Sequence, residues 1–236
     1  NKLGDFRNAG QTWPKLECSK GIPEDVVTRV AIPTVLISEE QIRDLVRTLE
    51  IRYVGNRDPH LFFALLTDPP DSSQRFDDKD HHVSLCSGLI EELNQKYGDS
   101  GVRPFYHFHR HRVFNEVENT WMGWERKRGK LHELNRLLRG ATDTTFLSLG
   151  GNNPAVPPGV RYVITLDTDT RLPIGSAKRL IGKMAHPLNR PRLDPISRRV
   201  VEGYGVLQPR VTPSLPTVRD GSIYQRVFTS PTGIDP

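Results

Sequence analysis

Residues 160–173 read Val160-Arg-Tyr-Val-Ile-Thr-Leu-Asp167-Thr-Asp169-Thr-Arg-Leu-Pro173. The first seven of them form an apolar, β-branched run, which is typical of a buried strand. Two carboxylates, Asp167 and Asp169, follow this run directly. Open α/β sheets bind ligands outside the carboxyl ends of their strands. The stretch therefore predicts an α/β sheet with an acidic site at the end of this strand.

The Asp167-x-Asp169 pair has more than one interpretation. Two acids can hold a hard divalent cation, and the cation can hold a diphosphate, so our main hypothesis is a metal and nucleotide-sugar site. The same residues also suit an ordinary acidic turn. An apolar strand followed by Asp-x-Asp-x-Thr also resembles the opening motif of haloacid-dehalogenase-type phosphatases, in which Asp167 would be the nucleophile.

The composition limits the classes of protein that the chain can represent. The chain has 236 residues and a formal net charge of +5, which suits an anionic partner such as a nucleotide, a nucleic acid or an anionic membrane. Its apolar runs are all much shorter than about eighteen residues, so we expect a soluble piece. Cys18 and Cys86 lack metal-type spacing, and free thiols are favoured over a single disulfide. The polar start without Met and the ending at Pro236 indicate a piece of a longer protein.

Strands and helices are expected to alternate. A strand is expected over 26–37, with Pro33 marking its end or an irregularity, because proline removes a ladder donor. Ser38 and Gln41 form a capping box, and an apolar stripe from Ile42 predicts the following helix. A second strand over 61–67 delivers another acid, Asp68, at its carboxyl end.

The remaining segments continue the alternation. Further strands are expected over 102–108 and 200–206, and further helices over 85–97, 131–140 and 177–184. This order predicts a mostly parallel α/β sheet flanked by helices. We expect an irregular lead-in over 1–25 and one domain over 26–236.

Three histidines alternate along the third expected strand. His107, His109 and His111 would share one face and could bind zinc. Arg110 and Arg112 would oppose a cation there, so we favour an exposed or interface face.

Residues 121–130 are basic and aromatic and lead into a helix. We expect Lys130 in the first helical turn, where free backbone N–H groups favour phosphate. The alternatives are a solvated basic face and a nucleic-acid patch.

Several collinear segments closely resemble the cyclic β-1,2-glucan synthases. The residues that carry this resemblance are Trp121–Leu131, Leu134–Gly140, Val163–Thr170, Met184–Pro191, Gly203–Val211 and Gly233–Pro236. The segment around Gly129-Lys130 and Leu134-Asn135 also looks like the wider family of processive, inverting glycosyltransferases that includes the cellulose synthases.

The resemblance implies a GT-A, Rossmann-like fold that is truncated on its C-terminal side. It implies UDP-glucose as donor, Mg²⁺ or Mn²⁺ as cofactor, and β-1,2-glucosyl transfer onto a growing glucan. Family members are large multidomain proteins of the bacterial inner membrane, with the transferase domain at the cytoplasmic face. A nucleic-acid partner is not implied.

The resemblance also implies roles for particular residues. Pro33, Thr34 and Asp68 would line the uridine pocket, and Lys130 would face the diphosphate. Asp167 would hold nucleotide and metal, and Asp169 would hold metal. The general base of the family lies downstream of the point where this chain stops, at Pro236. We therefore expect a donor-binding half-site that is inactive alone.

Two other functions fit less well. The phosphatase needs a later Lys and paired acids, but the acids after Asp169 are scattered, and three strand–helix units precede the supposed nucleophile. The interpretation as a nucleic-acid-binding module is supported only by the positive net charge of the chain and by residues 121–130. Strongly salt-dependent DNA or RNA binding that UDP cannot displace would support it.

Overall fold

The computed structural model describes residues 13–77, 81–99, 102–149, 156 and 158–209. The chain divides into two compact units, residues 1–190 and residues 191–236. The motif Gly233–Pro236 lies outside the described residues. Among the described residues, no helix is long and apolar enough to cross a membrane.

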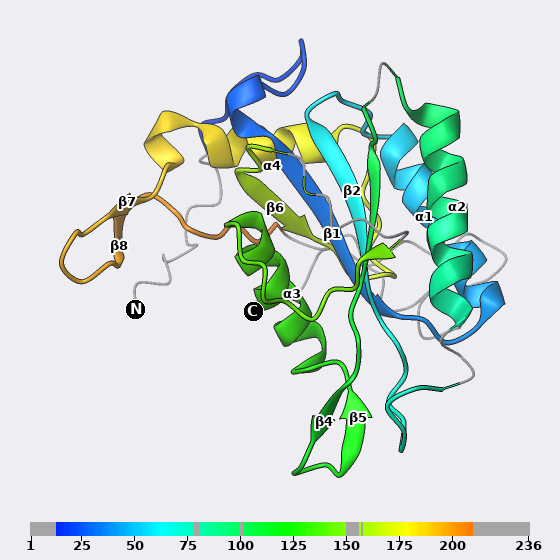
Figure 1. The fold of residues 1–236 in the computed structure, drawn as a ribbon. Coiled ribbons are helices and arrows are strands. Elements are labelled where there is room, and N and C mark those ends of the chain that lie inside the picture. The colour runs from blue at the N-terminus through cyan, green and yellow to red at the C-terminus, as the bar shows by residue number, and fades with distance from the viewer. Residues whose placement is uncertain (1–12, 78–80, 100–101, 150–155, 157, 210–236) are drawn as a thin grey trace, which may run out of the picture. The chain divides into compact units, whose positions relative to one another are not determined.

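The first unit is built on a parallel sheet. Its strand order is β3-β2-β1-β6, with neighbouring strands paired in parallel (Figure 1). The strands are β1 (Thr28–Val35), β2 (Leu61–Asp68), β3 (Phe105–His109) and β6 (Tyr162–Thr165). The predicted mostly parallel α/β sheet is confirmed.

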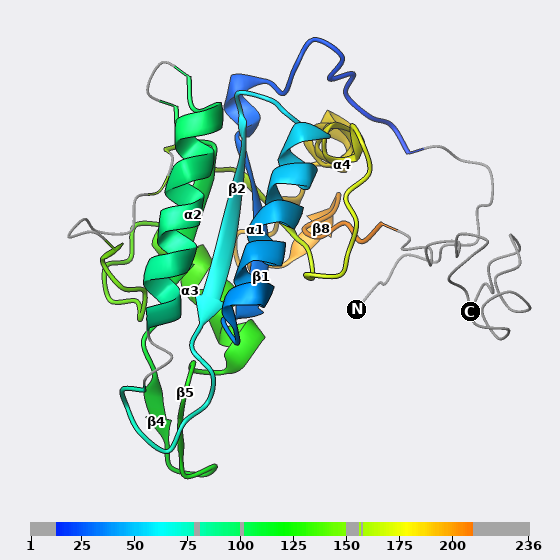
Figure 2. The ribbon, with the colours of Figure 1, turned by 90° about the vertical axis from the view of Figure 1, so that its right-hand side faces the viewer.

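Helices cover both faces of this sheet. Figures 1 and 2 show α1, α2 and α4 on one face and α3 on the other. The remaining elements of the unit are η1 (Glu24–Val26), α1 (Glu39–Val54), α2 (His82–Tyr97), β4 (Val113–Asn115), β5 (Thr120–Met122), α3 (Arg126–Leu138), α4 (Ser176–Ala185) and η4 (Pro187–Asn189). The second unit contains the antiparallel pair β7 (Arg192–Leu193) and β8 (Val200–Glu202).

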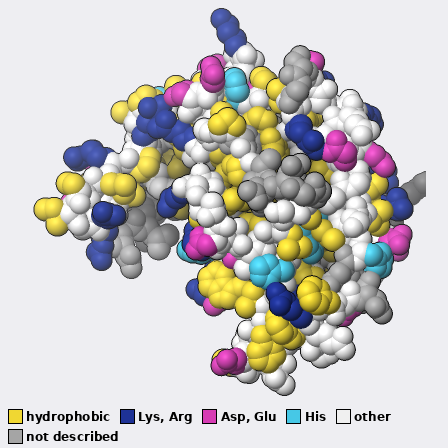
Figure 3. All heavy atoms as spheres, viewed as in Figure 1, with side chains coloured by type: hydrophobic (Ala, Val, Ile, Leu, Met, Phe, Trp, Pro, Cys, Tyr) yellow, Lys and Arg dark blue, Asp and Glu magenta, His cyan; other side chains and the backbone are white. Residues whose placement is uncertain are grey.

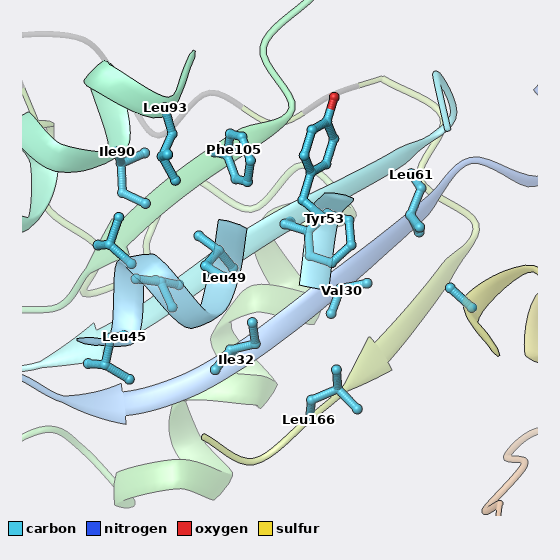
Figure 4. Close-up of a cluster of buried hydrophobic side chains, with 14 of the residues drawn as sticks. Val30, Ile32, Leu45, Leu49, Tyr53, Leu61, Ile90, Leu93, Phe105 and Leu166 are labelled. Atoms are coloured by element: carbon cyan, nitrogen blue, oxygen red, sulfur yellow. The ribbon is translucent and has the colours of Figure 1, made fainter. Parts of the chain in front are cut away.

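Each face of the sheet has its own core, because successive side chains of a strand point to opposite faces. Val30 and Ile32 of β1 join Leu49 and Tyr53 of α1 in the larger core (Figure 4). Ala31 instead joins the smaller core beneath α3. One half of the predicted capping box is present, since the Ser38 hydroxyl accepts a hydrogen bond from the Gln41 N–H at 3.2 Å, while the Gln41 side-chain oxygen accepts from the N–H of Ile37 at 2.9 Å.

Pro33 does not end β1, contrary to the prediction. The strand continues to Val35, and Pro33 lies opposite Leu66 of β2. The carbonyls of Val27 and Ala31 accept hydrogen bonds on the β6 side. Alternate residues of β1 direct their N–H and C=O groups toward the same neighbouring strand, so the position of Pro33, two residues after Ala31, faces β6. The pairing of β6 with β1 already ends at Ala31. The ladder with β2 therefore loses no donor.

Two other predicted strands differ from the prediction. The strand expected over 160–166 is shorter and only half-buried, because β6 pairs with a single neighbour, β1, in the described part of the chain. The strand expected over 200–206 does not extend the parallel sheet. Only Val200–Glu202 are in a strand, β8, which pairs with β7 in a short exposed ribbon.

Candidate functional site

A buried ion pair lies at the carboxyl end of β2. Asp68 accepts two hydrogen bonds from the Arg110 guanidinium, from Nε at 2.8 Å and from Nη2 at 2.9 Å. The Arg110 side chain is fully buried, and that of Asp68 is 5% exposed. Such a two-pronged pair fixes the position of the carboxylate as well as its charge.

Lys130 joins this pair from α3. Its Nζ lies 3.1 Å from Asp68 Oδ2 and also donates to the backbone carbonyl of Thr34. β1 and β2 are neighbours in the sheet, so their carboxyl ends bring Thr34 and Asp68 together above α3. The structure thus joins three residues that the sequence analysis assigned to the donor site. Pro33 directly precedes Thr34 in β1.

Lys130 does not lie in the first turn of its helix, contrary to the prediction. The helix begins at Arg126, five residues before the expected Leu131, so Lys130 is beyond the free N–H groups of the first turn. Any attraction of an anion at this position therefore comes from the ammonium group of Lys130 and not from the free N–H groups at the start of the helix. The pKa of Lys130 is lowered to about 8, mainly because the side chain is buried; Asp68 acts in the opposite direction, and Arg110 adds a smaller lowering effect.

Two further residues complete the buried network. Glu133 lies 3.3 Å from Arg110 Nη1 and accepts a hydrogen bond from the Thr145 hydroxyl at 2.6 Å. Gly123 packs so closely that a Cβ there would lie 2.5 Å from the Asp68 carboxylate. Neither Arg110 nor Glu133 was predicted as a site residue, because the sequence carries no signal that they meet Asp68.

The predicted acidic pair follows β6 on an exposed turn. Asp167 forms an ion pair with Lys127 of α3, and both side chains are more than half exposed. Asp169 is exposed and lines a separate surface pocket beside the N-terminal part of α1, together with Ser38 and Asp44.

The backbone of this turn is held from α1, although its carboxylates are exposed. Arg52 Nη2 donates to the carbonyls of Thr168 at 2.7 Å and of Thr170 at 2.6 Å. Asn56, two residues beyond the end of α1, accepts a hydrogen bond from the N–H of Ala177 at 3.1 Å and so connects the start of α4 to the segment that follows α1. The turn is therefore positioned through its backbone carbonyls, while both acid groups stay exposed and Asp167 is paired with Lys127.

The two acids of this turn are residues that could hold a hard divalent cation. Asp167 and Asp169 supply carboxylate oxygens, the ligands that Mg²⁺ prefers. The described residues contain no cluster of three or more His, Cys, Asp or Glu side chains able to hold a metal ion. The described residues therefore do not surround a metal ion with protein ligands alone. Magnesium is usually bound by one or two carboxylates together with phosphate groups of a substrate.

We expected the three histidines to share an exposed or interface face, but His107 and His109 make contacts inside the fold, and His109 is buried. His107 and His109 both bond to the Thr67 hydroxyl, each at 2.8 Å, and the Ser87 hydroxyl contacts His107 on its other side. Burial, with a smaller effect of His109, lowers the pKa of His107 to about 3. His111 lies beyond the end of β3. These contacts with β2 and α2 give His107 and His109 a structural role.

The chain is similar to one segment of a much longer protein. It is 48% identical over 217 residues to the cyclic beta-(1,2)-glucan synthase NdvB of Rhizobium meliloti (strain 1021). The alignment covers 92% of this chain but only 8% of that protein. The resemblance predicted from the motifs is therefore confirmed. A scan against protein-family models gives no match.

Proposed function

We propose that this chain forms the donor-binding part of a glucosyltransferase that uses UDP-glucose to build a β-1,2-linked glucan. The observation that carries the proposal is the alignment of acids along the carboxyl edge of the sheet. Asp68 is the last residue of β2, and Asp167 lies just beyond the end of β6. These two strands lie on either side of β1, which carries Thr34. Lys130 and Lys127 of α3 pair with these two acids.

This edge offers the groups that a nucleotide diphosphate requires. When glucosyl transfer releases UDP, negative charge develops on the diphosphate and must be stabilised. Lys130 is held in place and carries its charge at neutral pH, and Asp167 and Asp169 would hold Mg²⁺ or Mn²⁺. That ion would supply further positive charge to the diphosphate. Pro33, Thr34 and Asp68 would contact the uridine.

Transfer also needs a base that removes the proton from the attacking hydroxyl of the acceptor. We place this base downstream of Pro236 in the longer protein, as the resemblance implies, so the chain alone binds donor without completing an inverting transfer. We further propose that the longer protein works at the cytoplasmic face of the bacterial inner membrane. Its product would be the growing glucan, and its partners would not include nucleic acid.

Calorimetry with UDP-glucose, with and without Mn²⁺, tests the proposal. We expect binding that depends on Mn²⁺ and is lost in Asp169→Ala. Asp25→Ala is the matched control, because Asp25 is an exposed acid in η1, just before the amino end of β1. Circular dichroism establishes that each variant is folded.

Three results would overturn the proposal. They are the absence of UDP-glucose binding by the folded chain, binding that is independent of Mn²⁺, and equal binding by Asp169→Ala. DNA binding that UDP does not displace would favour the nucleic-acid alternative instead.

A further inference from the structure

A second pocket lies beside the buried network, at the hairpin formed by β4 and β5. It has a volume of about 500 Å³. Its lining residues are Val113, Phe114, Asn115, Glu116, Glu118, Met122, Trp124, Glu125 and Arg126. Figure 3 shows hydrophobic side chains at the surface over this hairpin, with acidic side chains at its tip. None of these residues belongs to the donor site described above.

Two aromatic rings give the pocket apolar faces. Phe114 is 43% exposed and Trp124 is 44% exposed, although both are large and hydrophobic. Exposed aromatic side chains with polar neighbours are typical of a binding surface. The faces of a glucose ring carry C–H groups that pack against such rings, while its hydroxyls point to the sides.

The pocket wall is rigidly connected to the donor site. Arg110, which holds Asp68, also donates from Nη1 to the Trp124 carbonyl at 2.9 Å and from Nη2 to the Arg126 carbonyl at 3.0 Å. Gly129 permits this packing, because a Cβ there would lie 2.0 Å from the Trp124 carbonyl oxygen. One buried guanidinium therefore positions both the donor-site acid and the aromatic wall.

The charge of the pocket selects against phosphate. Three carboxylates, those of Glu116, Glu118 and Glu125, line it with one cation, and Glu125 also pairs with Arg128 beside the pocket at 2.7 Å. The lining cation, Arg126, is already paired with Asp71 at 3.0 Å and with Glu118 at 2.7 Å. An anionic nucleotide would be repelled, whereas a neutral ligand rich in hydroxyl groups can donate hydrogen bonds to the carboxylates.

We infer that this pocket binds the glucan acceptor, with a glucosyl ring against Phe114 and Trp124 and its hydroxyls bonded to the pocket carboxylates. The inference rests on the proposed function, since it supplies the second substrate of that reaction. It adds a site on the hairpin to the donor site at the sheet edge. The shared Arg110 would hold acceptor and donor in one fixed arrangement.

Titration of the 236-residue chain with a linear β-1,2-glucan oligosaccharide tests this inference, with binding followed by calorimetry and by tryptophan fluorescence. We expect binding that Phe114→Ala weakens at least about tenfold, the loss of one well-packed contact. Glu116→Gln, which keeps the shape of an exposed side chain, should weaken binding less. Phe76→Ala removes an exposed aromatic outside the pocket and should have no effect.

The two proposals fail in different ways. Phe114→Ala should retain metal-dependent UDP-glucose binding, and Asp169→Ala should retain glucan binding. The inference is overturned if the folded chain binds no glucan, or if Phe114→Ala and Phe76→Ala bind it equally. It is also overturned if a lysine-rich peptide or an oligonucleotide occupies the pocket and the glucan does not compete.

Discussion

Two acid–lysine pairs at one edge of the sheet have opposite environments. Asp68 and Lys130 are almost completely buried, at 5% and 2% side-chain exposure. Asp167 and Lys127 are 54% and 55% exposed. Both lysines belong to α3, and both acids follow strands of the same sheet. The same two chemical groups therefore form a fixed structural contact in one place and an exchangeable surface contact in the other.

This difference indicates separate roles for the two pairs within the donor site that we propose. A buried pair is costly to break, because the remaining charge has no water to solvate it. An exposed pair contributes little to stability and can change partner at small cost. The Asp68 region is thus suited to hold the shape of the site, and the Asp167 turn is suited to receive a metal ion with its ligand.

The largest effect is expected from removing Arg110. Arg110→Met leaves Asp68 and Glu133 buried without their shared cation and should lower the free energy of unfolding by about 3–5 kcal/mol. Urea denaturation measures this change. The control is Arg103→Met, which breaks the exposed pair with Glu91 and should cost less than about 1 kcal/mol. Equal effects of the two substitutions would contradict the structural role of the buried pair.

Arg52→Met should have an intermediate effect, through the turn that carries Asp167 and Asp169. It removes the hydrogen bonds to the carbonyls of Thr168 and Thr170, so the free energy of unfolding should fall by about 1–3 kcal/mol. Affinity for UDP-glucose with Mn²⁺ should fall as well. Arg43→Met, on the exposed side of α1, is the control. If Arg52→Met were destabilised but bound UDP-glucose with unchanged affinity, the hydrogen bonds from Arg52 to this turn would not be needed for donor binding.

The pKa of Lys130 predicts a pH effect on donor binding. The ammonium group is charged below a pKa of about 8 and neutral above it, so its attraction for diphosphate is present at pH 7 and lost as the pH rises. If only the charged form binds, UDP-glucose affinity should fall about tenfold between pH 7 and pH 9. Calorimetry at several pH values measures this dependence. The Lys130→Met variant should bind UDP-glucose weakly, with an affinity that does not change between pH 7 and pH 9. If its affinity fell with pH as steeply as that of the unchanged chain, the titrating group would be another residue.

The smallest effect on stability is expected from Lys127→Met. The exposed pair with Asp167 should contribute less than about 1 kcal/mol to the free energy of unfolding. The same substitution removes a cation that competes for the Asp167 carboxylate, so Mn²⁺ should bind somewhat more tightly when nucleotide is absent. A calorimetric titration with MnCl₂ measures this change. Weaker Mn²⁺ binding by Lys127→Met would mean that Lys127 helps to form the metal site.

The sequence by itself determined the fold class and the location of the acids. Apolar runs and capping residues mark strands and helices locally, as Ser38 and Gln41 do for α1. The strand pattern placed Asp68 and Asp167 each at the carboxyl end of a strand, and the family resemblance assigned both to one donor site. Local pattern was sufficient for these features because each depends on neighbouring residues in the chain.

Only the tertiary structure decided which groups are buried and what they bind. Lys127 and Lys130 stand three residues apart in one basic run, and no local pattern distinguishes them. Lys130 is the buried one because α3 packs against the ends of β1 and β2, where Thr34 and Asp68 accept its hydrogen bonds. Arg110 was not predicted for the same reason. Its partner Asp68 is 42 residues away in the sequence, and only the packing of β2 against β3 brings the two together.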